Sequence, residues 1–185
     1  VMNAVRDRAF EDFRRQGFPT RKVERYKYTD MEKIFAPNYG LNINRIEFPV
    51  DPYAAFRCDV PNLSTLLYFV VNDAFYTKRL PNVQPEEGVV IGSLRKAAEE
   101  HPELIARYYA RIAKTEEDAI TALNTMLAQD GLFIYVPKNV QMEKCVQIIN
   151  ILRADVSMMV NRRVLIVMEE GAKAKFLFCD HTADD

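Results

Sequence analysis

Four strand-like runs follow one another in the carboxy-terminal part of the chain, and no helix-length segment separates them. They are rich in Val, Ile, Leu and Phe, and they span residues 132–136, 145–152, 164–168 and 174–179. Parallel pairing of consecutive strands needs a crossover of about a dozen residues, usually a helix. The pattern therefore predicts a parallel β-helix or a meander of β-hairpins, and the irregular spacing of the run centres leaves both open.

A helix is predicted near the amino terminus, because apolar residues recur there at steps of three and four. The residues on this apolar face are Met2, Val5, Ala9 and Phe13. Gly17 is positioned to end the helix, since glycine tolerates the left-handed geometry common at helix ends.

Capping residues, or a proline suited to a first turn, mark four later helix starts: Thr29, Ser93, Pro102 and Thr115. Glu32 and Asp118 complete capping-box patterns with the two threonines. After Pro102, the spacing of Leu104, Tyr108 and Ile112 predicts one buried helix face.

Residues 66–71 form an apolar run, and Asn72-Asp73 then supply residues that accept positive φ angles. With residues 74–77, this pattern predicts a β-hairpin. A short strand is predicted at 89–91, and the proline-interrupted segment 39–61 is predicted to be loop with a short strand. The fold class is therefore α+β. Residues 1–130 are predicted to be a mostly helical region with a small hairpin, and residues 131–185 to contain the later strands.

Composition limits the classes of protein to which the chain can belong. The 185 residues include 25 basic and 26 acidic side chains and are 49% hydrophobic, which suits a folded core and provides no long-range field for nucleic acid. The apolar run 66–71 is too short to span a membrane. Cys58, Cys145 and Cys179 fit neither a disulfide framework nor a CxxC clip, so we expect a reducing compartment and a cytoplasmic protein. The chain begins with Val1-Met2 and ends just after a strand-like run, so we also expect a piece of a longer protein.

Common catalytic fingerprints are missing from the sequence. No two of its six glycines are two positions apart, which excludes the GxGxxG dinucleotide turn. With only His101 and His181, a zinc-binding HExxH helix cannot form, and no serine lies in a GxSxG elbow. We therefore predict a protein without catalytic residues of its own.

Cys179 and His181 are the candidate metal ligands, because residues two apart project from one face of a strand. Cys145, in an earlier strand-like run, is the candidate for a third ligand. The alternative is structural: buried cysteine usually behaves as a small hydrophobic residue, and we favour this interpretation. Metal binding by this chain therefore stays undecided at the level of sequence.

The segment 21–28 interleaves basic residues with tyrosines, as surfaces that bind single-stranded nucleic acid do. This supports an alternative function, a nucleic-acid-binding module. The competing interpretation is a solvated connector whose tyrosines pack on the core, and we favour it because no RNA-recognition signature follows.

Several blocks of the sequence resemble the SufD family of iron–sulfur cluster assembly scaffold subunits. The blocks are PTRKVERYKYTD at 19–30, NDAFY at 72–76, ALN at 122–124, DGLFIYVP at 130–137 and NRRVLI at 161–166. Their order and spacing match the family over nearly the whole chain. The sequence departs from the family pattern at Tyr26, Asp73, Cys145 and Arg162, where Trp, Gly, Pro and Pro are usual.

The resemblance implies a fold and a set of partners. It implies that residues 131–185 begin a right-handed parallel β-helix, and that the protein is a non-catalytic scaffold that pairs with a SufB-like paralogue. A SufC-like ATPase would bind through carboxy-terminal helices beyond Asp185, and no family site residue maps onto this chain. No cofactor is expected on this part, with iron or a cluster present transiently in the full complex. An uncovered β-helix end also predicts self-association, for example as a homodimer.

Overall fold

The computed structural model describes residues 1–41, 43, 51–55, 64–152 and 157–182. The helices are α1 (Met2–Gln16), the 3₁₀ turn η1 (Glu24–Tyr26), α2 (Met31–Phe35), α3 (Pro52–Ala55), α4 (Leu94–Glu100), α5 (Pro102–Tyr108) and α6 (Ala119–Leu127). The strands are β1 (Gly40–Leu41), β2 (Thr65–Val71), β3 (Ala74–Phe75), β4 (Val90–Ser93), β5 (Gly131–Val136), β6 (Cys145–Leu152), β7 (Met158–Met159), β8 (Arg163–Met168) and β9 (Phe176–Thr182).

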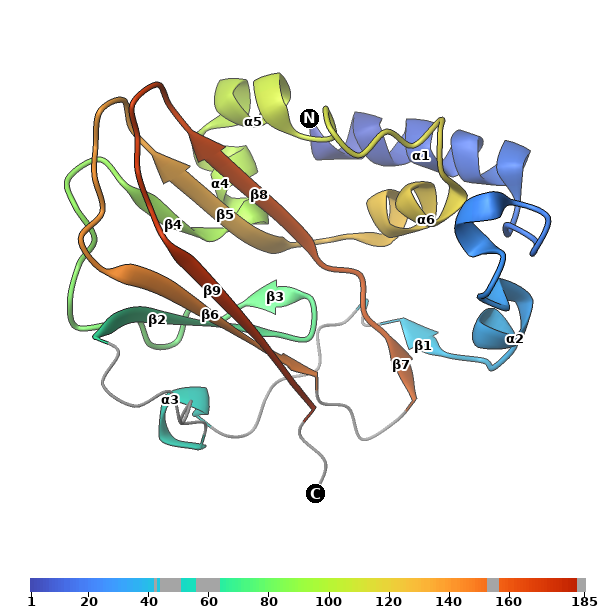
Figure 1. Ribbon diagram of the computed structural model, residues 1–185, viewed down its shortest axis with the longest axis horizontal. Coiled ribbons are helices and arrows are strands. Elements are labelled where there is room, and N and C mark those ends of the chain that lie inside the picture. The colour runs from blue at the N-terminus through green and yellow to red at the C-terminus, as the bar shows by residue number, and fades with distance from the viewer. Residues whose placement is uncertain (42, 44–50, 56–63, 153–156, 183–185) are drawn as a thin grey trace.

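Two sheets form the centre of the molecule (Figure 1). One has the strand order β3-β2-β6-β9 and the other the order β4-β5-β8, while β1 and β7 pair separately. The pairs β2–β6, β6–β9 and β5–β8 are parallel, and β2–β3 and β4–β5 are antiparallel. The α+β class is confirmed, and in the described part of the chain none of these sheets closes on itself.

Strands pair with the next-but-one run rather than with the next one. Gly131 of β5 pairs with Arg163 of β8, which is 32 positions later, and Val146 of β6 pairs with Phe176 of β9, 30 positions later. An isolated parallel bridge between Gln141 and Lys173 repeats the interval of 32. The hairpin meander is therefore wrong, because its consecutive strands would be antiparallel neighbours.

Three apolar clusters hold these layers together. The first lies between the two sheets and includes Leu66, Ile134 and Ile148. The second lies under the helices on the other face of β5 and β8, around Phe133 and Ile105. The third lies on the outer face of β2 and β6: Phe69, Ile149 and Ile151, with Tyr53 packed against them. Alternation of side chains along each strand explains why neighbouring residues belong to different clusters.

The hairpin prediction is confirmed. Val70 and Val71 of β2 pair with Phe75 and Ala74 of β3, and Asn72 in the turn has a φ of 54°. The same strand β2 also pairs with β6, and β4 pairs with β5, so strands from before residue 130 extend both sheets. The division into 1–130 and 131–185 stays a prediction.

Two predicted helix caps are wrong, by one residue in α2 and by three residues in α6. Asp30, not Thr29, caps α2 by accepting a hydrogen bond from the Lys33 amide, and Asp118, not Thr115, caps α6. In both places a carboxylate stands next to the helix start, where its charge also interacts favourably with the helix dipole. The cap at Ser93 is confirmed, with Oγ 3.1 Å from the Lys96 amide nitrogen.

Ile112 does not belong to a buried helix face. Helix α5 ends at Tyr108, and Ala110 then adopts a φ of 57°, which breaks the helical spacing. Ile112 is 96% exposed as a result. In the segment 39–61, β1 confirms a short strand and α3 adds an unpredicted helical turn, while Cys58 lies outside the described residues.

Gly131 is the first residue of β5 and pairs with Arg163, the first residue of β8. Its φ is 155°, and a Cβ atom on it would lie 1.9 Å from the carbonyl oxygen of Arg163. Any side chain would push these two parallel strands apart.

We predict that Gly131→Ala lowers the free energy of unfolding by about 3 kcal/mol, because backbone atoms cannot yield as a flexible side chain can. Urea denaturation followed by circular dichroism measures the change. Gly92→Ala is the matched control, since Gly92 also lies in a strand and no heavy atom beyond its chain neighbours lies within 4 Å of the place that a Cβ would occupy. Equal midpoints for the two variants would contradict the prediction.

Candidate functional site

Three of the sequence blocks that carry the family resemblance meet in space around helix α6. The block 19–30 contacts the amino-terminal end of α6, the block 122–124 lies within it, and the block 161–166 contacts its side. Figure 1 shows α6 between α1 and the strands β5 and β8. We therefore take this junction as the first candidate site.

Asp118 joins the block 19–30 to α6. Its Oδ2 accepts hydrogen bonds from the Tyr26 hydroxyl at 2.6 Å and from Arg25 Nη1 at 3.0 Å, while Oδ1 accepts one from the Thr121 amide at 2.7 Å. The carboxylate is only 8% exposed. A buried carboxylate with three donors is fully satisfied, so this contact fixes the position of the segment around η1.

These contacts shift two pKa values in opposite directions. Burial raises the pKa of Asp118, but the hydrogen bonds from Tyr26, Thr121 and Arg25 outweigh burial, and the net pKa is lowered. Burial and the bond to the Asp118 carboxylate together raise the pKa of Tyr26 to about 12. Tyr26 therefore remains a hydrogen-bond donor throughout the neutral pH range.

A second set of contacts joins α6 to β5 and β8. Asn124 donates from Nδ2 to the Arg162 carbonyl oxygen at 3.1 Å and accepts from Arg163 Nη1 at 3.2 Å. Asp130 accepts bonds from the Ser93 hydroxyl and the Arg95 amide, which ties the start of β5 to the start of α4. The resemblance blocks therefore contain residues that join elements, and their chemistry here is structural.

The basic segment 21–28 is largely engaged in ion pairs. Arg21 pairs with Asp30 at 2.9 Å, Arg25 with Asp118, and Lys27 with Glu24 at 3.6 Å. Tyr26 is partly buried and its hydroxyl bonds to Asp118, whereas Tyr28 is 92% exposed. Nucleic-acid binding by this segment stays a prediction, and three of its four cations already have acidic partners.

The candidate metal ligands lie on strand β9. Cys179 packs against the cluster around Phe69 and Ile149, and its Sγ is 3.9 Å from the side-chain nitrogen Nε2 of Gln147. His181 pairs in register with Ile151 and is exposed. Cys179 is opposite Ile149 of β6 in the register, and Ile149 lies four positions after Cys145 on that strand. The two cysteines are therefore offset by about 13 Å along the strand direction.

Cys145 is therefore not brought to the other two candidates. Among the described residues, no group of three or more His, Cys, Asp or Glu side chains could hold a metal ion. Cys179 and His181 stay a prediction as metal ligands, and any further ligand would have to come from outside the described residues.

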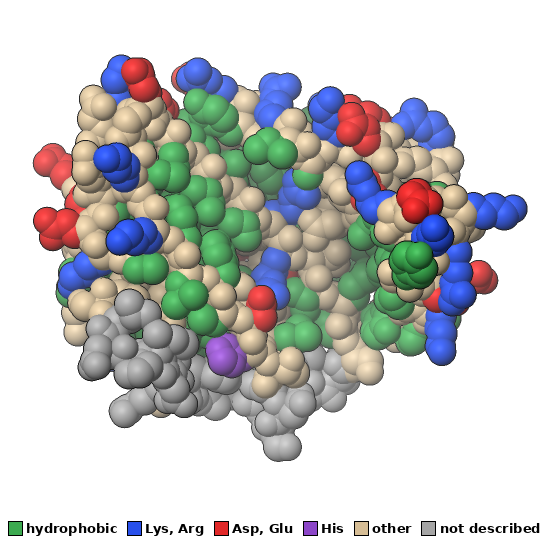
Figure 2. All heavy atoms as spheres, in the orientation of Figure 1, with side chains coloured by type: hydrophobic (Ala, Val, Ile, Leu, Met, Phe, Trp, Pro, Cys, Tyr) green, Lys and Arg blue, Asp and Glu red, His purple; other side chains and the backbone are tan. Residues whose placement is uncertain are grey.

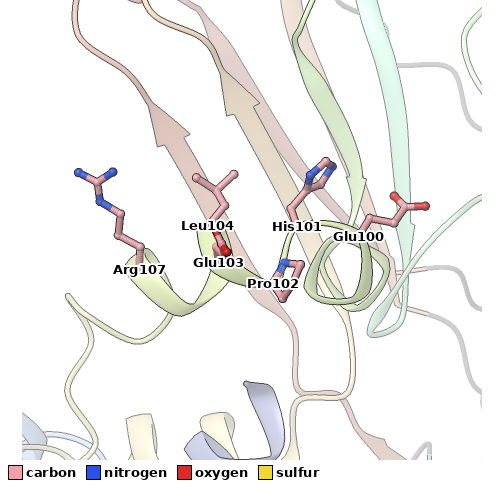
Figure 3. Close-up of a pocket in the computed structure, with 6 residues that line it drawn as sticks. All are labelled: Glu100, His101, Pro102, Glu103, Leu104 and Arg107. Atoms are coloured by element: carbon pink, nitrogen blue, oxygen red, sulfur yellow. The ribbon is translucent and has the colours of Figure 1, made fainter.

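A surface hollow of about 560 Å³ lies at the corner between α4 and α5. Figure 3 shows its lining, which includes His101, Leu104 and Arg107, all from one short stretch of chain. None of the predicted site residues lies in it, and its lining carries no grouping of residues that we can connect to a reaction.

The second candidate site is the outer edge formed by β8 and β9, the place at which an uncovered β-helix end is expected from the sequence. Each strand is the last in its sheet. Val164 of β8 is 52% exposed, although its neighbour in β5, Leu132, is 1% exposed. Likewise, Phe178 of β9 is 40% exposed beside the fully buried Ile148 of β6.

This edge presents apolar side chains in an ordered row. Figure 2 shows hydrophobic side chains gathered over β8 and β9 on the face turned to the viewer. By alternation along the strands, Val164 lies on the same side as Ile166 and Phe178 on the same side as Phe176, and both of those partners pack on the cluster between the sheets. The edge therefore continues the apolar interior outward, and none of the described elements forms a layer over it.

Comparison with known sequences gives the chain its family. The sequence model of the SufBD protein N-terminal region matches residues 1–148. The chain belongs to the SufBD family. This confirms the resemblance expected from the sequence blocks, and the family is involved in iron–sulfur cluster assembly.

Among curated SufBD relatives, the iron–sulfur cluster assembly protein SufD of Bacillus subtilis is 29% identical over 157 residues, covering 84% of this chain. SufBD family proteins of Synechocystis and of Arabidopsis thaliana are 33% and 30% identical over 50% and 58% of the chain. The aligned part spans 35%, 19% and 24% of the three relatives. The aligned part of this SufBD chain thus spans about a third of SufD and about a fifth to a quarter of the other two relatives.

No helix in the described part of this SufBD chain is both long enough and apolar enough to cross a membrane.

We predict that Asp118→Ala lowers the free energy of unfolding by about 2–3 kcal/mol, because it removes the α6 cap and the anchor of Arg25 and Tyr26. Tyr26→Phe is the matched variant and should cost about 1 kcal/mol, since it deletes only one hydroxyl donor. Chemical denaturation at neutral pH measures both changes.

The difference between the native chain and Asp118→Ala should also depend on pH. Since folding lowers the pKa of Asp118, its contribution is present above the ordinary carboxyl pKa and is lost as the pH falls through the lowered value. An Asp118→Ala difference that stayed constant down to strongly acidic pH would contradict the assignment.

The uncovered β8–β9 edge predicts self-association of the 185-residue chain. Unpaired strand edges with exposed apolar side chains pair with other chains readily. Light scattering on size-fractionated protein should show dimers or larger species at high concentration, and Phe178→Lys should shift them toward monomer. A monodisperse monomer at high concentration would count against this prediction.

Proposed function

We propose that this chain is the amino-terminal part of a non-catalytic scaffold subunit for iron–sulfur cluster assembly, in which β5, β6, β8 and β9 begin a right-handed parallel β-helix. The observation that carries the proposal is the parallel stacking of β8 on β5 and of β9 on β6 at nearly equal intervals of 32 and 30 residues. Such an interval is what one coil of a β-helix produces, because each coil contributes one strand to every sheet.

The exposure of successive layers supports continuation of the stack. Leu132 and Ile148 are buried, and the residues stacked on them, Val164 and Phe178, are half exposed. A further coil, after residue 185 in a longer chain, would cover both and pair the free edges of β8 and β9. The length of the relatives, about three times the matched part in SufD, leaves room for such coils.

In the proposed complex, the chain acts in the cytoplasm with a SufB-like paralogous scaffold and a SufC-like ATPase. The paralogue would cover a free sheet edge of the completed β-helix, and the ATPase would bind a carboxy-terminal region beyond Asp185. Iron or an iron–sulfur cluster is then the cargo of the whole assembly, held transiently. Family membership supports this role, since SufBD proteins are involved in iron–sulfur cluster assembly.

The continuation of the stack is testable by one substitution in two lengths of chain. In the 185-residue chain, Val164→Lys should change the free energy of unfolding by less than about 0.5 kcal/mol, because Val164 is half exposed. In a longer gene product it should cost about 2 kcal/mol or more, since a charge would be buried between coils. Leu80→Lys, which replaces a residue of similar exposure outside the sheets, should be neutral in both.

The partners are tested by co-expression of a tagged longer gene product with the neighbouring paralogue and ATPase. We expect the longer product to capture both and the 185-residue chain to lose the ATPase, because the proposed ATPase contact lies beyond Asp185. Capture of neither by the longer product would leave family membership intact and would overturn the proposed complex.

A further inference from the structure

A hollow of about 360 Å³ lies between the loop that follows α5 and the first residues of β8. The loop contributes Tyr109, Arg111 and the exposed Ile112, and the other wall comes from Asn124, Arg162 and Arg163. It is separate from the α4–α5 corner, from the anchor at Asp118 and from the metal candidates on β9. The proposed scaffold function makes no use of it.

The charge of this lining is one-sided. Three of the eleven residues that line the hollow are arginines, and none of the eleven is Asp or Glu. Two carboxylates outside the lining interact with Arg162: Asp180, which is 3.6 Å from its Nη2, and Asp73. In a chain with a formal charge of -1, such a grouping creates a local positive potential that favours an anion.

Arg163 is held in place for such a role. Its Nη1 donates to the Asn124 Oδ1 at 3.2 Å, and its guanidinium lies over the Tyr109 ring at 5.5 Å from the centroid. Both contacts fix the plane of the group and leave further N–H donors on it. Arg111 is oriented by its own bonds to the carbonyl oxygens of Arg107 and Ala106, both at 3.3 Å.

Two buried donors in the same lining have no hydrogen-bond partner among the described residues. They are the hydroxyl of Tyr109, which is 5% exposed, and Nη1 of Arg162. Buried donors are nearly always satisfied in native proteins. Arg162 also interacts with the carboxylates of Asp180 and Asp73, so it is the Tyr109 hydroxyl that points to a bound acceptor in this hollow. Tyr109 and Arg111 also line a neighbouring hollow, in which Glu116 lies beside Arg8 and Lys114.

We propose that the hollow between the 108–113 loop and the start of β8 binds a small oxyanion, of phosphate or carboxylate type, between Arg111 and Arg163. Planar guanidinium groups match the oxygens of both types of anion and bind them through charge-assisted hydrogen bonds. Ile112 and the apolar part of the lining would contact any carbon body attached to the anion.

The test is a titration of the 185-residue chain, followed by two-dimensional amide NMR, with inorganic phosphate and separately with acetate at constant ionic strength. We expect saturable shifts confined to residues near 109–113 and 162–165 with at least one of the two anions. The anion that saturates at lower concentration identifies the ligand type. The same titrations on a longer gene product would show whether later coils leave the hollow open.

Arg111→Gln and Arg163→Gln should each weaken binding about tenfold, the loss expected for one charge-assisted hydrogen bond. Arg163→Gln also removes the contacts to Asn124 and Tyr109, so Arg111→Gln keeps the test valid if the former variant unfolds. Lys175→Gln is the matched control, because it removes one exposed positive charge beside the start of β6, outside the lining of the hollow, and should bind normally. Shifts that never saturate with either anion, or equal affinity in Arg111→Gln and Lys175→Gln, would overturn the proposal.

Discussion

The structure beyond Gly131 depends on one constraint, the parallel register between strands that are two runs apart in the sequence. Because β5 aligns with β8 and β6 with β9, the connections between consecutive runs must cross from one sheet to the other. This crossing places the two sheets face to face and encloses the apolar cluster around Ile134 and Ile148. It also brings the Gly131 backbone so close to Arg163 that only glycine fits there.

The helical part is attached to this stack by a few satisfied polar groups rather than by a broad apolar face alone. Asp118 anchors η1 to α6, Asn124 connects α6 to β8, and Asp130 connects β5 to α4. These contacts explain in physical terms why several separate blocks carry the family resemblance: each supplies one side of a junction. The same junctions create the hollow beside Arg163, since the loop after α5 has to turn at Ala110 before α6 begins.

Much of the local structure could be predicted from the sequence, and the failures have a common origin. The extent of α1, the Ser93 cap and the β2–β3 hairpin follow from residues close in sequence, and these predictions hold. The spacing of consecutive run centres does not indicate how the strands pair, because consecutive strands lie in different sheets. The intervals between alternate centres contain the signal, since Ile134 and Ile166 are 32 residues apart and are paired. The caps predicted at Thr29 and Thr115 are wrong because Thr and Asp are both preferred N-cap residues, and here a nearby Asp caps the helix.

The sequence by itself determined the family, the α+β class and the positions of most helices and strands, because these follow from short-range propensity and from the order of the blocks. Only the tertiary structure decided that Cys145 lies away from Cys179, that Val164 and Phe178 are the residues exposed at the outer edge, and that three arginines line a hollow beside Tyr109 whose lining contains no acidic residue. These are relations between residues distant in the chain. Register and burial set them, and neither can be read from spacing along one strand.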